Sequence, residues 1–191
     1  MSIITFSHQK GGVGKSTLAF NVAKKIYESA NVCIVDYDKQ GSLSQVSDMV
    51  YFDILENVLP EELPELDYDF VLVDTPPYLA TNLTKIFEVS DIIVVPTRAG
   101  ILDLFAIKGT IDLITEAKKQ DNALIVFNLI KHNTTITQDI VNEMKTFNIK
   151  IAETKIQDLV SFTRSILVDT LDSKAQDHID NLTEEILNMI I

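Results

Sequence analysis

The chain has 191 residues, of which 46% are hydrophobic, and this length and composition predict one domain, spanning residues 1–191, with a sizeable core. The formal net charge of −12 argues against a protein whose whole surface binds nucleic acid. A single cysteine, Cys33, excludes an intrachain disulfide framework and a cysteine-ligated metal cluster within one chain. Because Cys33 lies in an apolar run, we interpret it as a buried structural thiol.

Targeting and membrane signals are absent from the sequence pattern. No basic and apolar leader precedes the first predicted strand, and no apolar run approaches the roughly 18 residues that a membrane span requires. We therefore expect a cytoplasmic protein with no membrane partner.

A glycine-rich segment, KGGVGKST at residues 10–17, lies between an apolar run at 3–6 and a stretch with helical apolar spacing. A strand, a glycine-rich turn and a helix form the context of a phosphate-binding loop, because glycines let successive N–H groups approach an anion. The helix N-terminus adds partial positive charge at the same place. Lys15 would then reach the β- and γ-phosphates of a nucleotide, and the hydroxyl of Ser16 would bind Mg²⁺.

This segment departs from the ordinary phosphate-loop pattern, which requires glycine where the chain has Gln9. A second lysine, Lys10, stands at the start of the loop instead. KGGVGKST therefore resembles the deviant phosphate loop of the ParA/MinD-type ATPases, in which this first lysine crosses a dimer interface to the nucleotide of the partner subunit. The resemblance implies that ATP or ADP is bound by Lys10, Gly11, Gly12, Val13, Gly14, Lys15, Ser16 and Thr17.

Two further predicted strands end in acidic residues: the run at 31–36 leads into Asp36 and Asp38, and the run at 70–74 ends in Asp74. Such acids can be simple solvated strand ends, but the carboxyl edge of a parallel sheet is also where ligands bind. From its position, Asp74 can hold Mg²⁺ as a Walker B acid does. By the resemblance, Asp38 orients or deprotonates the attacking water and is a candidate metal ligand, while Asp36 lies near the Mg²⁺ shell.

The segment 51–69 carries seven acidic residues and no basic residue, and Pro60 and Pro64 interrupt regular structure. A solvated surface is the simpler interpretation of this run, and a docking face for a basic partner segment is the alternative. A short helix is expected just before it, at 42–49.

The middle of the chain alternates strands, at 92–96 and 123–128, with an amphipathic helix between them. This alternation predicts an α/β fold: a doubly wound, mostly parallel sheet with helices on both faces, which is the P-loop NTPase fold that the resemblance implies. Residues 96–98 and 102–103 resemble the family's loop near the dimer interface. Asn128 is placed like the residue that contacts adenine in relatives, although a lone asparagine can equally form a turn.

Beyond Thr135 the resemblance weakens. The spacing predicts a helix with apolar residues from 136 to 147, a short strand at 150–152 and closing helices at 157–170 and 175–190. Arg164 falls where relatives often place an arginine that faces DNA, and an ordinary surface arginine is the alternative. The polar face of the last helix is acidic, so we assign its apolar stripe to core packing and not to a lipid surface.

The family resemblance implies an ATPase of plasmid or chromosome partition that hydrolyses ATP to ADP and phosphate as a switch, with Lys10, Lys15 and Asp38 as catalytic residues. Its ATP-bound homodimer binds non-specific DNA on the nucleoid, and a centromere-binding, ParB-like partner stimulates hydrolysis. The alternative is a MinD-like or other ParA-like positioning ATPase that acts on a protein cargo without DNA. A small-molecule kinase or ligase of the dethiobiotin-synthetase type is a weaker third alternative, because it would not need Lys10.

The charge of −12 bears on the DNA prediction, since phosphate neutralisation by lysine and arginine dominates non-specific affinity. Any DNA face must therefore be a local basic patch. The residues available for it are Lys108, Lys118, Lys119, Lys131, Lys145, Lys150, Lys155 and Arg164.

Overall fold

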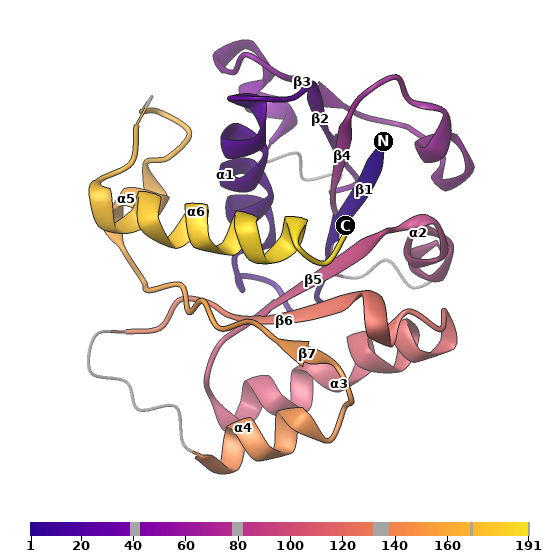
Figure 1. Cartoon of the computed structure of the whole chain (residues 1–191), viewed down its shortest axis with the longest axis vertical. Helices are drawn as coiled ribbons and strands as arrows, with labels where there is room; N and C mark the ends of the chain where they lie inside the picture. Colours follow the sequence, from indigo (N-terminus) through magenta and orange to yellow (C-terminus); the bar gives the residue numbers. More distant parts are fainter. Residues whose placement is uncertain (39–42, 78–81, 132–137, 169, 191) are drawn as a thin grey trace.

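A computed structural model of the chain describes residues 1–38, 43–77, 82–131, 138–168 and 170–190. Seven strands form one sheet in the order β3-β2-β4-β1-β5-β6-β7, and every described pairing is parallel (Figure 1). The strands are β1 (Ser2–Phe6), β2 (Val32–Asp36), β3 (Asp53–Leu55), β4 (Phe70–Asp74), β5 (Ile92–Thr97), β6 (Ala123–Phe127) and β7 (Lys150–Ile151). The predicted doubly wound parallel sheet is thereby confirmed.

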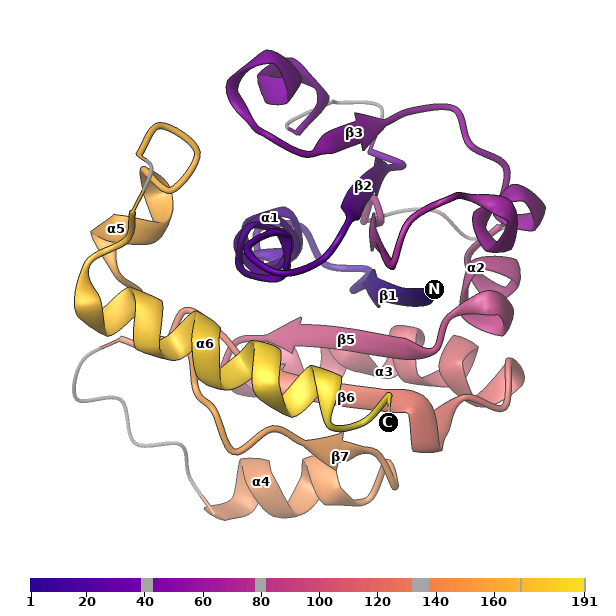
Figure 2. The ribbon, with the colours of Figure 1, turned by 45° about the horizontal axis from the view of Figure 1, so that its top comes forward.

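Helices cover both faces of this sheet. The α-helices are α1 (Lys15–Tyr27), α2 (Leu83–Val89), α3 (Ile101–Glu116), α4 (Gln138–Lys145), α5 (Val160–Thr163) and α6 (Ser173–Leu187), and the 3₁₀ helices are η1 (Ser44–Met49), η2 (Pro60–Glu65) and η3 (Gln120–Asn122). Figures 1 and 2 show α1 and α6 on one face of the sheet and α2, α3 and α4 on the other. Within the described residues, no helix is long and apolar enough to cross a bilayer.

The inner strands β1, β2, β4, β5 and β6 are largely apolar on both sides because both faces of the sheet are covered. In β1, Ile4 and Phe6 pack with α1 and α6, whereas Ile3 packs on the opposite face beside α2. This alternation follows from the twofold period of side chains along a strand. Cys33 lies in the same buried layer as Ile3 and is fully buried, which raises the pKa of its thiol to about 12 and confirms it as a buried thiol.

Sheet register brings the acidic strand ends together. Phe6 of β1 and Asp36 of β2 both lie opposite Asp74 of β4, so the three strands end in one row. The glycine-rich loop leaves β1 directly after this row. The loop and the two acids therefore share the carboxyl edge of the sheet, where ligands bind in open α/β folds.

The predicted helix at 157–170 is wrong, because among the described residues of this range only Val160–Thr163 is α-helical. The preceding chain runs beside β6 in an extended form: the N–H of Ile156 donates to the carbonyl of Phe127 (2.9 Å), and Gln157 bridges to Ile130. Backbone pairing of residues 156–158 with Phe127 and Ile130 thus keeps the start of the predicted helix extended.

Three other elements differ from expectation. The strand β3 was not predicted; it is a short, acidic edge strand paired with β2, and shortness and charge are common at sheet edges. The helix α2 was not predicted either, and the predicted helix at 42–49 is a 3₁₀ helix over Ser44–Met49. Ile136 and residues 39–42 lie outside the described residues, so the start of the predicted 136–147 helix is not placed.

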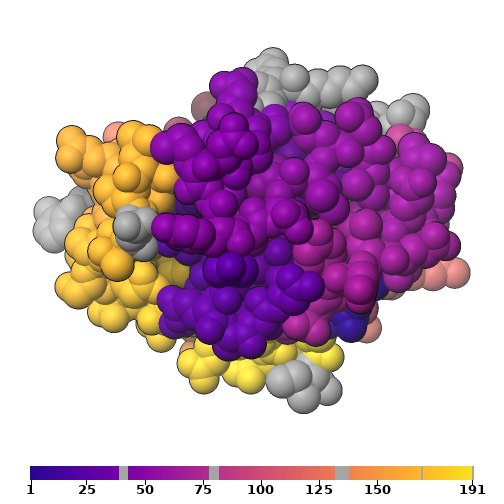
Figure 3. Space-filling view, turned by 90° about the horizontal axis from the view of Figure 1, so that it is seen from above, coloured from indigo at the N-terminus to yellow at the C-terminus, as the bar shows by residue number. Residues whose placement is uncertain are grey.

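All seven acids of the segment 51–69 are exposed, which agrees with a solvated surface. This segment falls in the purple to magenta surface that covers much of the face seen in Figure 3. In α6, the apolar stripe is core packing as predicted, since Ile179, Leu182 and Ile186 are buried.

Candidate nucleotide site

The glycine-rich loop turns through two left-handed backbone positions before α1 begins. Gly12 has φ 69° and Gly14 has φ 91°, values that favour glycine. Gly14 is the N-cap of α1, and no side chain hydrogen-bonds to this cap. The first N–H groups of α1 and the partial positive charge of its N-terminus therefore face the loop, as an anion site requires.

Asn128, which follows β6, closes the loop from the other side. Its Nδ2 donates to the carbonyl oxygen of Val13 at 2.7 Å, and the residue is 2% exposed. A Cβ on Gly14 would come within 2.3 Å of the same Nδ2 atom. Asn128 therefore braces the loop; its predicted contact with adenine stays a prediction.

Gly14→Ala is expected to lower the free energy of unfolding of the nucleotide-free protein by roughly 2–3 kcal/mol, because it adds both a left-handed strain and a clash with Asn128. Thermal unfolding should then shift down by roughly 5–10 °C. Gly11→Ala is the matched control, since its Cβ would meet no atom within 4 Å. Equal melting temperatures for the two variants would contradict the packing described here.

Asp74 is the most buried acid of the site. It has no exposed surface, and neither of its carboxylate oxygens has a hydrogen-bond partner within the described part of the chain. Burial raises the pKa of Asp74 to about 7, and the neighbouring Ser16 hydroxyl and Lys15 ammonium oppose this rise without cancelling it. An orphaned buried carboxylate beside a hydroxyl is a donor set that fits a hard cation such as Mg²⁺.

Asp36 uses its carboxylate differently. Its Oδ1 accepts the N–H of Asp38 at 2.9 Å and its Oδ2 accepts the N–H of Ser44 at 3.2 Å. Asp36 thus holds Asp38 and Ser44 by their backbones, and burial raises its pKa. This role was not predicted from the sequence, which placed Asp36 near the Mg²⁺ shell.

Lys15 lies close to the remaining acids. The residue is 7% exposed, and burial lowers its pKa while the charges of Asp74 and Asp38 raise it. The structure therefore places Asp38 and Asp74 near Lys15 at the start of α1, and the predicted binding and catalytic roles of these residues stay predictions. The described residues hold no group of three or more His, Cys, Asp or Glu side chains arranged for a metal ion, so a bound cation would need phosphate or water ligands as well.

Residues 98–103, which follow β5, contact the glycine-rich loop at Lys10 and Gly12. Asp103 Oδ1 lies 2.6 Å from Lys10 Nζ, and the guanidinium of Arg98 donates to the carbonyl of Gly12 at 2.8 Å. His8 Nδ1 accepts the N–H of Lys10 at 2.8 Å, and burial lowers the pKa of this imidazole to about 4. Only proximity of this segment to an interface was predicted; its contacts with the loop join residues far apart in sequence.

A small cavity adjoins the loop on the side of α5. Its lining includes residues of the loop and α1, residues after β6 and residues that lead into α5: Gly14, Thr17, Leu18, Asn128, Leu129, Asp158, Leu159, Phe162 and Thr163. Asp158 and Phe162 were not predicted as site residues, because only the tertiary structure places them beside the loop. Arg164, at the end of α5, has an exposed side chain.

Residues 4–170 match the family described as the CobQ/CobB/MinD/ParA nucleotide binding domain. The chain belongs to this family. Over 98% of its length it is 25% identical to the maintenance of carboxysome distribution protein A of Halothiobacillus neapolitanus, of which it covers 95%.

Two solved structures show the fold of the family. The chain resembles a putative plasmid partition protein from Borrelia burgdorferi bound to AMPPNP with a TM-score of 0.78 and 16% identity, covering 100% of this chain and 99% of that one. It also resembles cobyrinic acid a,c-diamide synthase from Mycobacterium smegmatis with a bound ATP analogue and magnesium, with a TM-score of 0.79, 18% identity, and 98% and 94% coverage. These likenesses establish the nucleotide-binding fold and, at such identities, no particular activity.

Proposed function

We propose that residues 1–191 form one ATPase domain of the ParA type, which hydrolyses ATP to ADP and phosphate and uses the change of nucleotide as a switch. The observation that carries this proposal is the convergence of Lys15, Asp38 and Asp74 beside a left-handed glycine loop at the start of α1. Membership of a nucleotide-binding family that includes ParA and MinD supports it.

The chain's own residues would supply positioning and charge, which is most of what phosphoryl transfer needs from a protein. The loop N–H groups and Lys15 would bind the phosphates, and the cavity beside Asn128 would take the base. Bound Mg²⁺ would compensate charge on the phosphate oxygens, held by Ser16 and Asp74 with Asp38 nearby. Asp38 would orient the attacking water and accept its proton.

Lys10 would act in trans. The Lys10 side chain is 38% exposed. In a dimer of two copies that face each other at this loop, the Lys10 ammonium of one copy could contact the phosphates of the nucleotide bound by the other copy. The active state would then be a twofold-symmetric ATP-bound homodimer. Hydrolysis would remove the charge that holds the two copies together, so nucleotide state would set the oligomeric state.

The cargo of this switch is proposed to be DNA in plasmid or chromosome partition. The ATP dimer would bind non-specific DNA on the nucleoid through Arg164 and nearby lysines. A centromere-binding, ParB-like partner would stimulate hydrolysis. The similarity of fold to a plasmid partition protein supports this choice.

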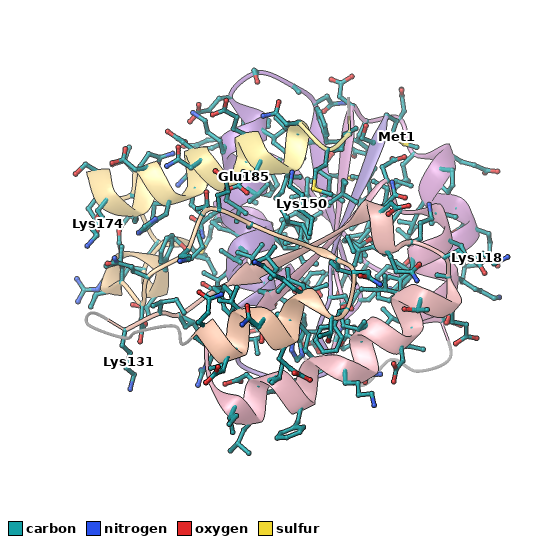
Figure 4. All side chains as sticks on the ribbon, turned by 60° about the horizontal axis from the view of Figure 1, so that its bottom comes forward. Met1, Lys118, Lys131, Lys150, Lys174 and Glu185 are labelled. Atoms are coloured by element: carbon teal, nitrogen blue, oxygen red, sulfur yellow. The ribbon has the colours of Figure 1, made fainter. Side chains whose placement is uncertain are left out.

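A protein cargo without DNA is the second candidate, and the charge distribution favours it. The chain carries a net charge of −12, and Figure 4 shows Lys118 at the opposite end of the molecule from Lys131 and Lys174, so these three do not cluster in one basic patch. The similarity to a carboxysome distribution protein supports a protein cargo.

The test is molar mass by light scattering in ADP and in ATP. We expect a monomer with ADP, a dimer with ATP, an ATP dimer that persists in Asp38→Ala, and no ATP dimer in Lys10→Ala although this variant still binds ADP. An ATP dimer of unchanged stability in Lys10→Ala would contradict the trans role. A gel shift at low salt separates the two cargo classes: no shift with ATP excludes the DNA face.

A further inference from the structure

Lys10 is held inside its own subunit by an acid that lies 93 residues away in the sequence. Its Nζ donates to Asp103 Oδ1 at 2.6 Å, with Lys10 38% exposed and Asp103 10% exposed at the side chain. The Lys10 ammonium is thus paired with a carboxylate that is mostly buried. A phosphate on a facing subunit would therefore compete with Asp103 for the Lys10 ammonium, because the phosphate and the carboxylate are both negative and repel each other.

The backbone around Asp103 is shaped to place this carboxylate. Asp103 is the third residue of α3, where the free N–H groups of the helix start favour a negative charge. Gly100 caps the helix, and a Cβ at this position would come within 2.6 Å of Asp103 Oδ2. The carboxylate thus occupies space that only glycine leaves open.

Two further contacts tie the segment before the loop to α3. The N–H of Gln9 donates to Thr110 Oγ1 at 3.0 Å, and a Cβ on Gly109 would come within 2.3 Å of Gln9 Oε1. Together with the ion pair, these contacts make Gln9, Lys10 and α3 one connected unit. A change at the start of α3 would therefore act directly on Lys10.

The first turn and a half of α3 also exposes three large apolar side chains. Ile101 is 64% exposed, Leu102 74% and Phe105 72%, and the three lie in sequence on both sides of Asp103. Clustered exposed apolar residues of this size mark an interaction surface. If the nucleotide phosphates of a second copy contact Lys10, that copy must approach the molecule beside Ile101, Leu102 and Phe105. We therefore take a second copy of the chain as the partner of this apolar surface.

We propose that Asp103 is a positioning residue that keeps Lys10 in its own subunit until a second copy docks on the apolar residues Ile101, Leu102 and Phe105. On docking, Lys10 leaves Asp103 for the phosphates of the facing subunit, and the ion pair is a restraint on premature dimerisation. This inference rests on the proposed function, because it assumes that Lys10 acts in trans.

The first experiment measures the dimer dissociation constant by light scattering in a non-hydrolysable ATP analogue for Asp103→Asn, Asp103→Ala and the wild type. Removing the restraint is expected to tighten the dimer about 5-fold, with ADP affinity unchanged within twofold. Asp112→Asn, on an exposed position of the same helix, is the matched control and should not change the dimer. Leu102→Ser with Phe105→Ser should weaken the dimer at least about 10-fold. A dimer that is unchanged or weaker in both Asp103 variants would overturn the restraint.

A second measurement does not depend on dimerisation. Acylation of the Lys10 amine by acetic anhydride, followed by mass spectrometry on the ADP-bound protein, should be several-fold faster in Asp103→Asn, because the amine is released from its partner. If the wild type never dimerises with ATP but this acceleration is seen, the proposed function fails while the cis restraint stands. An unchanged acylation rate would overturn the restraint itself.

Discussion

Replacing Lys15 with alanine is expected to lower the affinity for ATP at least about 100-fold, the largest single effect on binding in this chain. Lys15 is 7% exposed, so its charge is little screened by water and would bind a phosphate oxygen strongly. Losing a buried charge-assisted contact costs about 3 kcal/mol or more, which corresponds to a factor above 100 in dissociation constant.

Isothermal titration calorimetry with an ATP analogue and Mg²⁺ would measure this loss. Lys25→Ala is the control, because Lys25 is a more exposed lysine of the same helix that pairs with Glu28 at 2.7 Å. We expect its affinity to match that of the wild type. A loss below about 5-fold for Lys15→Ala would show that Lys15 does not face the phosphates.

Asp74→Asn is expected to stabilise the nucleotide-free protein at neutral pH and to abolish its response to Mg²⁺. The pKa of Asp74 is raised from 3.8 to about 7 by burial, so the folded protein keeps this proton where the unfolded chain has released it. The folded state thus binds more protons between about pH 4 and 7, and Asp74 lowers the free energy of unfolding as pH rises through this window. Asparagine has nearly the same shape and carries no such cost.

Urea unfolding of wild type and variant at pH 5 and pH 8 would measure the effect. The stability gained by the variant should grow by about 2–3 kcal/mol between these pH values, since one pKa unit corresponds to about 1.4 kcal/mol. His8 acts in the opposite sense, because its pKa of about 4 makes stability fall as pH drops below 6.5. This contribution is common to both proteins and cancels in the difference. A gain that does not change with pH would mean that Asp74 is already ionised well below neutral pH.

The local motif and the strands could be read from the sequence because neighbouring residues determine them. The left-handed glycine at the start of the helix, Gly14 with φ 91°, is predicted by the eight residues KGGVGKST alone, without reference to any distant segment. The buried strands are likewise visible as short apolar runs, since burial on both faces removes polar residues from the whole run. The prediction for 157–170 failed for the opposite reason: its first residues pair with the chain just after β6, at Ile130, and apolar spacing carries no information about that neighbour.

The sequence by itself determined the loop, the acids at the strand ends and the alternation of buried strands with helices that predicts a parallel sheet. Only the tertiary structure decided which side chains meet: Asp74 without a hydrogen-bond partner among the described residues, Asn128 against Val13, and Lys10 on Asp103. The contact between Asn128 and Val13 joins residues 115 positions apart, and the contact between Lys10 and Asp103 joins residues 93 positions apart. Strand order and register set which distant segments face each other, and no property of a short stretch of residues encodes that choice.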